Sequence, residues 1–216
     1  MSNSSRQREA TVEQVSAVRE GDGKVLASVF DIYRERLWQI INFRLDSRLR
    51  GRVDADDVLQ EAYLDAQKRI EHFKEDSAQS LFIWLRLIAN QTLIDVHRRH
   101  LGTKARDVSR ERSISGQWAS ESTTFSLSSH LLGHLTSPSQ AALRAELSQQ
   151  LMLALDSMGP LDREVLALRH FEELTNGETA KVLELSEQAA SLRYVRALGR
   201  LKQVLQRIPG FSEGFQ

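Results

Sequence analysis

Residues 175–207, with the sequence TNGETAKVLELSEQAASLRYVRALGRLKQVLQR, decide the fold of the C-terminal part of the chain. Thr175 and Glu178 have the spacing of a capping box, which predicts a short helix ending near Leu183. After a turn, Ser186 can cap a longer helix that ends before Pro209. A short helix, a tight turn and a longer helix are typical of a helix-turn-helix.

The longer helix has one apolar and one basic face. Its predicted core positions recur at steps of three and four: Ala190, Tyr194, Leu198, Leu201 and Leu205. Its basic side chains are Arg193, Arg196, Arg200 and Arg207. Residues 186–207 hold five basic residues and one acidic residue, a net charge of +4. Arginine can bind phosphates or a guanine edge, so the pattern favours DNA binding, with a solvated basic helix face as the alternative.

The N-terminal half also has helical periodicity, and no convincing stretch alternates with period two. Three helices are predicted over residues 24–45, 54–73 and 80–100. Their core stripes are Phe30, Tyr33, Leu37 and Ile41, then Val58, Ala62, Ala66, Ile70 and Phe73, then Leu81, Leu85, Ile88, Thr92 and Val96. The fold class is therefore all-α.

An acidic stripe lies on the predicted helix 54–73. Asp54, Asp57, Glu61 and Asp65 share one side of it, and with Asp56 they make five acids and no base between residues 54 and 65. Carboxylates near a helix N-terminus suit the helix dipole, which explains Asp54, Asp56 and Asp57. Glu61 and Asp65 lie too far along, and a docking face for a basic partner is the functional interpretation.

The predicted helix 80–100 places Trp84, Gln91, Asp95 and Arg98 roughly along one line. Residues 98–112 hold six basic and two acidic residues. An aromatic side chain near basic residues can bind single-stranded nucleic acid, whereas a lone tryptophan on a helix is more commonly part of the core.

Residues 101–137 are Ser-rich and lose helical periodicity, so they are predicted to form a flexible linker. Trp118, Phe125, Leu127, Leu131 and Leu132 could anchor it, either on this chain or elsewhere. A capping box at Ser137, Pro138 and Gln140 predicts the next helix. Two small helical domains are therefore expected: a polar segment (1–24), a first domain (25–100), the linker (101–137), a second domain (138–208) and a tail (209–216).

Composition excludes several classes of protein. The 216 residues include 29 basic and 29 acidic side chains and no cysteine. The zero net charge argues against indiscriminate coating of nucleic acid, and the absence of cysteine excludes disulfides and thiolate metal sites. His97 with His100, and His130 with His134, lack a third ligand, so neither a metal nor a cofactor is expected. No catalytic motif, signal peptide or membrane span is apparent, and a cytoplasmic, non-enzymatic protein is the simplest expectation.

Taken together, these motifs resemble the extracytoplasmic-function (ECF) type of bacterial RNA polymerase sigma factor. The segment 54–63 (DADDVLQEAY) is similar to the family's polymerase-docking helix. The segment 84–89 (WLRLIA), with Asp95, Arg98 and Arg99, resembles the helix that engages the −10 promoter element. Residues 161–169 (LDREVLALR), 178–180 and 186–198 resemble the domain that reads the −35 element.

The resemblance implies a role for each group of residues. Polymerase docking, against the clamp of the largest subunit, would fall to Asp54, Asp56, Asp57, Gln60, Glu61 and Asp65. Binding and melting of the −10 element would fall to Lys74, Ser77, Ser80, Trp84, Asn90, Gln91, Arg98 and Arg99. Contacts with the −35 element would fall to Gln188, Ser191, Arg193, Arg196 and Arg200. The implied partners are core RNA polymerase and promoter DNA, and an anti-sigma factor is left open.

Two other functions stay open at this point. A helix-turn-helix regulator would bind duplex DNA tightly without polymerase, usually as a dimer on two half-sites. A helical adaptor would have no role in DNA binding, and its basic helix face would be merely solvated.

Overall fold

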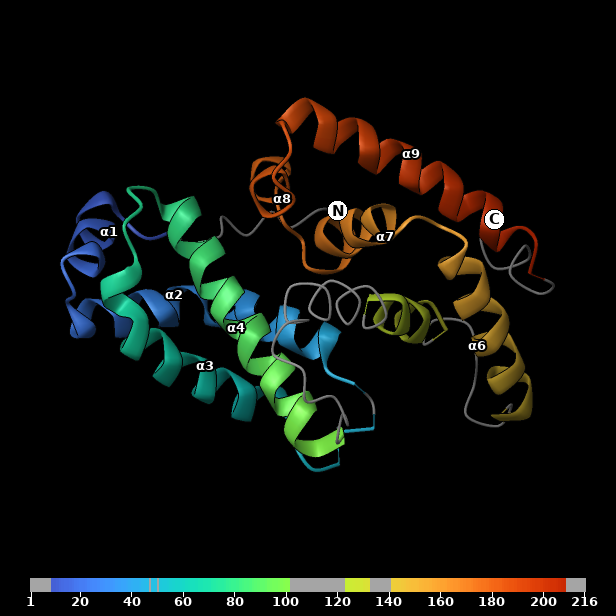
Figure 1. Ribbon diagram of the computed structural model, residues 1–216, viewed down its shortest axis with the longest axis horizontal. Coiled ribbons are helices and arrows are strands. Elements are labelled where there is room, and N and C mark those ends of the chain that lie inside the picture. Colours follow the sequence, from blue (N-terminus) through green and yellow to red (C-terminus); the bar gives the residue numbers. More distant parts are fainter. Residues whose placement is uncertain (1–8, 47, 50, 102–122, 133–140, 209–216) are drawn as a thin grey trace, which may run out of the picture. The chain divides into compact units, whose positions relative to one another are not determined.

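The computed structural model describes residues 9–46, 48–49, 51–101, 123–132 and 141–208. Every regular element within these ranges is helical (Figure 1), which confirms the all-α fold class. The chain divides into two compact units, one within residues 1–103 and one within residues 104–216. Neither unit contains, among the residues described, a helix long and apolar enough to span a membrane.

The first unit is a set of packed helices around one apolar core. Its elements are α1 (Val12–Arg19), α2 (Gly23–Arg44), α3 (Ala55–Arg69), a 3₁₀ turn (Ile70–His72) and α4 (Ala78–Leu101). Helices α2, α3 and α4 pack against one another, and α3 and α4 lie side by side in Figure 1. All core residues predicted for these three helices are buried, because their spacing keeps them on the shared inner face.

Helix α1 is an element that the sequence analysis did not predict. Thr11 and Gln14 form a capping box at its start, with Thr11 Oγ1 accepting from the Gln14 N–H at 3.3 Å. Val15 and Val18 are buried, and α1 packs on α2. Its two core residues are too few for a periodic signal, so the polar sequence around them obscured the helix.

The second unit contains the predicted helix-turn-helix. Its elements are a helix over residues 123–132, α6 (Ala141–Asp156), α7 (Pro160–Leu166), a π-helical turn (Ala167–Phe171), α8 (Asn176–Val182) and α9 (Glu187–Leu205). Thr175 and Glu178 form the predicted capping box of α8, and Ser186 caps α9. In the turn between them, Glu184 has φ of 55°, in the left-handed region that favours glycine.

Residues 123–132 correct the prediction for the linker. They form a helix, whereas the sequence predicted no helical order across residues 101–137. Thr123 Oγ1 donates to Glu164 Oε2 at 2.7 Å and Thr124 Oγ1 donates to Asp156 Oδ1 at 3.0 Å. Leu127 and Leu132 are buried, so two of the proposed anchors contact this same chain. Trp118, His134 and the capping box at Ser137 lie outside the described residues.

The buried face of α9 also differs from the prediction. Ala190 is buried as expected, but the next buried positions are Ala197 and Val204, at steps of seven. Leu198, predicted as core, is 38% exposed. Small side chains at these steps allow a close approach of α9 to α7, against which it packs. The helix is therefore turned so that Leu198 faces solvent, while Tyr194, Leu201 and Leu205 are only half-buried.

Candidate functional site

The first two acids of the predicted docking stripe are engaged at the start of α3. Asp54 Oδ1 accepts from the Asp57 N–H at 2.8 Å, and Asp57 Oδ2 accepts from the Asp54 N–H at 3.1 Å. Such reciprocal bonds satisfy N–H groups that the helix leaves without partners. Both residues remain exposed, so they can cap the helix and still present a negative surface.

Asp56 connects α3 with α2. Its carboxylate accepts from Arg34 Nη2 at 2.7 Å and from Trp38 Nε1 at 3.1 Å. The Arg34 and Asp56 side chains are each 56% exposed, so water screens this ion pair and it contributes little to stability. Asp56 therefore holds the start of α3 against α2 while keeping an accessible carboxylate.

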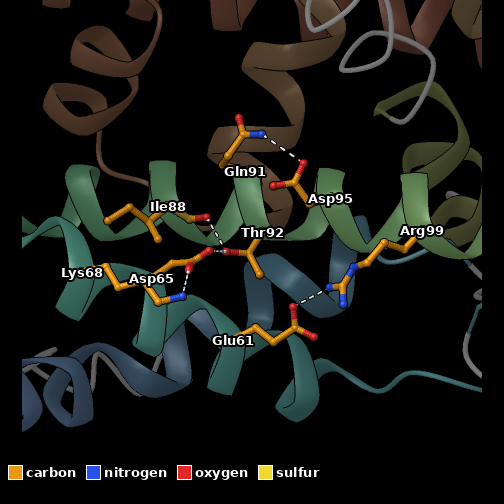
Figure 2. A network of polar contacts seen from close by, with 8 residues as sticks. All are labelled: Glu61, Asp65, Lys68, Ile88, Gln91, Thr92, Asp95 and Arg99. Carbon is orange, nitrogen blue, oxygen red and sulfur yellow. Dashed lines mark hydrogen bonds and ion pairs between the residues drawn. The ribbon is translucent and has the colours of Figure 1, made fainter. Parts of the chain in front are cut away.

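Glu61 and Asp65 face α4 in a polar network that Figure 2 shows. Glu61 forms an ion pair with Arg99, near the end of α4. Asp65 accepts from Lys68 Nζ at 3.0 Å and from Thr92 Oγ1 at 3.5 Å. The structure thus joins an acid predicted to bind polymerase with an arginine predicted to bind the −10 element.

An open groove of about 270 Å³ runs beside this acidic stripe, between α3 and the C-terminal half of α4. Its apolar lining is Val53, Leu64 and Val96, and its polar lining includes Gln60, Glu61 and His100. Leu64 is 48% exposed. Leu64 was not predicted as a site residue, although an apolar residue outside the core stripe of a polar helix is the signal that marks it.

The residues predicted to bind the −10 element differ in how far the fold buries their side chains. Lys74 is exposed before α4. Ser77 Oγ accepts from the Ser80 N–H at 3.1 Å and lies 2.9 Å from Ser80 Oγ. Ser80 is only 9% exposed, so its hydroxyl serves the start of α4. Its predicted direct DNA contact is not supported by this burial.

Trp84 lies on α4 with its ring centroid 5.4 Å from that of Phe73. The ring is half-buried, so one part packs on the core and another remains accessible. Further along α4, Gln91 Nε2 donates to Asp95 Oδ1 at 3.4 Å (Figure 2), and Arg98 lies 3.7 Å from the same carboxylate. Asn90 is half-buried with its side-chain oxygen enclosed, so Gln91 is the residue aligned with Asp95 and Arg98.

The basic face of α9 is organised by a carboxylate that the sequence analysis did not select. Asp162 on α7 is 2% exposed and forms ion pairs with both Arg193 and Arg200, the Arg193 distance being 2.9 Å. The two arginine side chains keep 39% and 57% of their surface accessible. Each can therefore reach outward while Asp162 fixes its orientation. The sequence does contain one sign of this arrangement. Arg193 and Arg200 are seven residues apart, as are the buried Ala190 and Ala197, so the two arginines lie on the same face of α9.

The outward face of α9 carries a different set of residues. Gln188, Ser191 and Arg196 are exposed, as the predicted DNA contacts require. Between them, Leu192 and Val195 are 45% and 65% exposed. All five line a shallow hollow near the start of the helix-turn-helix. The side chain of Asn176 donates to the Glu187 carbonyl oxygen at 2.9 Å, which ties the start of α8 to the start of α9.

A buried histidine links α4 to the segment after α2. His97 Nε2 lies 3.3 Å from the Asp46 N–H, in hydrogen-bonding distance. Burial lowers the pKa of His97, although the charge of Asp46 opposes this. Burial acts to raise the pKa of Asp46, but hydrogen bonds from Arg48 and its charge outweigh burial and lower it. No cluster of three metal-ligating side chains occurs in the described ranges.

Comparison with known proteins matches residues 9–206 to the family model described as ECF sigma factor. The RNA polymerase sigma-H factor of Pseudomonas aeruginosa is 27% identical over 200 residues, covering 92% of this chain and 95% of that protein. The ECF sigma factor SigW of Bacillus subtilis is 25% identical, with 90% and 96% covered. The solved structure of CnrH with the cytosolic domain of CnrY matches with a TM-score of 0.50 at 19% identity, covering 90% and 96%. That last likeness concerns the fold alone.

Proposed function

Because the chain belongs to the ECF sigma factor family, we propose that its two units divide the work of promoter recognition. The chain is an RNA polymerase sigma factor that binds core polymerase and directs transcription initiation at promoters. The observation that carries this conclusion is the family match, which extends over both units rather than over the helix-turn-helix alone. We assign core binding and −10 recognition to the first unit and −35 recognition to the second.

Core polymerase binds the exposed side of α3 in this proposal. Asp57 and Gln60 are exposed, and beside them Leu64 opens the groove toward Val96. Asp57 and Glu61 give the α3 side of this apolar groove an acidic edge, while Arg52 and His100 also line it; the acidic edge is complementary to a helix that presents apolar side chains between basic ones. We assign this surface to the clamp of the polymerase largest subunit.

The −10 element binds along α4. Lys74, Trp84, Gln91, Arg98 and Arg99 offer charge, an aromatic surface and hydrogen bonds to a displaced single strand. Extruding a base costs a few kcal/mol, which stacking and hydrogen bonds can offset. Because Arg99 is paired with Glu61, its contact with DNA is coupled to the docking surface.

The −35 element binds α9 through the major groove. Gln188, Ser191 and Arg196 face outward near the N-terminal half of the helix, the part that reads bases in helix-turn-helix proteins. Arg193 and Arg200 contact phosphates from the orientation that Asp162 gives them. The protein acts in the cytoplasm, where core polymerase works, and has no catalytic activity of its own.

Co-purification with core polymerase tests the docking assignment. Glu61→Lys reverses a charge on the proposed surface and places a second cation beside Arg99. We expect tagged full-length protein to retain core polymerase and the variant to retain at least tenfold less. Glu71→Lys, at an exposed acid on the 3₁₀ turn, is the matched control and should bind normally. Normal retention by a folded Glu61→Lys variant would refute the docking surface.

A further inference from the structure

One line of exposed positions on α9 contains residues that the fold does not require. Gln188, Leu192, Val195, Gly199 and Lys202 follow one another at steps of four, three, four and three, and all are exposed. Val195 is 65% exposed and Leu192 45%. A β-branched residue and a glycine are both unfavourable in an exposed helix interior. Nothing in the chain lies within 4 Å of a Cβ built at Gly199, so packing does not account for that glycine.

The surroundings of this line indicate a negatively charged partner. Arg196 flanks it, and Arg193 and Arg200 lie on the next face, fixed by Asp162. An exposed aliphatic pair fits poorly with a purely polar ligand, and two aliphatic side chains are too small an apolar face to hold a helix in a membrane surface. The pair fits the major groove of DNA, whose phosphates are negative and whose only apolar group on a base edge is the thymine methyl.

We propose that Leu192 and Val195 read thymine methyl groups in the −35 element. This inference rests on the proposed function and adds the base chemistry to it. The two residues lie about 4.5 Å apart along the helix axis at about 1.5 Å per residue. Base pairs are about 3.4 Å apart, so the contacted methyl groups lie on neighbouring base pairs. Gln188 and Ser191 supply hydrogen bonds on the same face.

With Leu192 and Val195 facing the bases, the residues on α9 have different roles from those first expected. The five residues first selected for −35 binding were all polar or basic, and two of them, Arg193 and Arg200, are held by Asp162 toward the side of the helix. The preference for particular bases then comes from the exposed line of residues that includes Leu192 and Val195. Arg193 and Arg200 add affinity for DNA that is largely independent of its sequence. Specificity at the contacted base pairs should favour thymine over cytosine, which presents an amino group but no methyl.

Removing single methyl groups from the DNA tests the inference. The preferred −35 sequence is first selected from a random duplex pool by the full chain assembled with core polymerase. Each thymine of that element is then replaced by deoxyuridine, which deletes only the C5 methyl. We expect one or two adjacent replacements to weaken holoenzyme binding by about fourfold each, the effect of exposing one buried methyl-sized group.

Variants of the protein assign the effect to the two side chains. In Leu192→Ala with Val195→Ala, the deoxyuridine effect should fall from about fourfold to none, because the methyl then has no partner to lose. Leu153→Ala is the matched control, since Leu153 is 66% exposed on α6 of the same unit. It should keep the full effect.

Three results would overturn the inference. The selected −35 element could lack thymines at neighbouring positions. Replacing its thymines by deoxyuridine could leave holoenzyme binding unchanged, or the deoxyuridine effect could persist in the double variant. If the double variant no longer retains core polymerase but keeps the deoxyuridine effect, then Leu192 and Val195 belong to a surface that binds protein and not DNA. Absence of any promoter-dependent transcription would refute the proposed function itself, and the inference would fall with it.

Discussion

Asp162 shows how one buried side chain can organise a binding surface. Its carboxylate is almost fully enclosed, yet it contacts two arginines whose side chains are still accessible. A buried carboxylate needs such partners, because an uncompensated charge in the interior is costly. The same contacts restrict the rotamers of both arginines, so in the proposed complex with the −35 element they would lose less side-chain entropy on binding DNA.

Replacing Asp162 should change both stability and specificity. Asp162→Asn should lower the free energy of unfolding by about 1–3 kcal/mol, less than a fully buried pair because the freed arginines can reach water. It should also raise non-specific DNA affinity and lower the ratio of specific to non-specific binding. Denaturant unfolding and competition binding by the holoenzyme measure the two effects.

A second carboxylate provides the control for that experiment. Asp156 pairs with Arg163 at 3.5 Å and accepts from Thr124, away from the arginines of α9. Asp156→Asn should lower stability without changing the specificity ratio. An unchanged ratio in a folded Asp162→Asn variant would show that Asp162 serves the fold alone.

Some of this residue-level picture was predictable and some was not. The capping box at Thr175 depends on residues three apart and was predicted from the sequence, whereas those at Thr11 and Asp54 were not. The pairing of Asp162 with Arg193 joins residues 31 positions apart. The spacing of seven places Arg193 and Arg200 on one face of α9, but local periodicity does not show which residue of α7 they contact. Ser80 was expected to contact DNA because of the family resemblance, and its burial by the fold depends on contacts that local sequence does not show.

At the scale of elements, periodicity predicted the existence of the longer helices, but the buried face only in the first unit, since the buried face of α9 differs from the prediction. Helices α2, α3 and α4 each repeat apolar residues over several turns, and their predicted cores are buried. The helix at residues 123–132 buries hydroxyl side chains that find carboxylate acceptors on α6 and α7. A Ser- and Thr-rich sequence resembles a linker until those acceptors are in place.

The contact between α4 and the segment after α2 should make stability depend on pH. The pKa of His97 is lowered below its ordinary value of 6.5 by burial. Between the lowered pKa and about 6.5, the unfolded state binds more protons than the folded state, so stability rises with pH there and is lost on acidification. Asp46 has a lowered pKa as well, and its contribution is lost only near and below pH 3.8.

Unfolding measured by tryptophan fluorescence between pH 5 and 7 tests this link. The slope contributed by His97 cannot exceed about 1.4 kcal/mol per pH unit. His97→Gln, which can still accept a hydrogen bond but does not titrate, should remove that slope. His72→Gln, at an exposed histidine, should leave it unchanged. A wild-type slope in the His97→Gln variant would contradict the assignment.

At the scale of the whole molecule, the zero net charge conceals opposite local charges. Residues 54–65 carry a charge of −5 and residues 186–207 carry +4. The structure neutralises part of the acidic stripe internally, through Arg34, Arg99 and Lys68. In the proposed function, the remaining charges are divided between a surface for polymerase and a surface for DNA. Low net charge implies weak affinity for bare DNA, so we expect specificity to appear only in the assembled complex.

Run-off transcription with the full chain, core RNA polymerase and a library of genomic fragments tests this central claim most directly. We predict discrete promoter-dependent transcripts when both proteins are present, none with core polymerase alone, and only weak binding of the isolated chain to the same fragments. The absence of promoter-dependent transcripts across the library, together with tight sequence-specific binding of DNA by the chain alone, would contradict it and identify a helix-turn-helix regulator that works without polymerase.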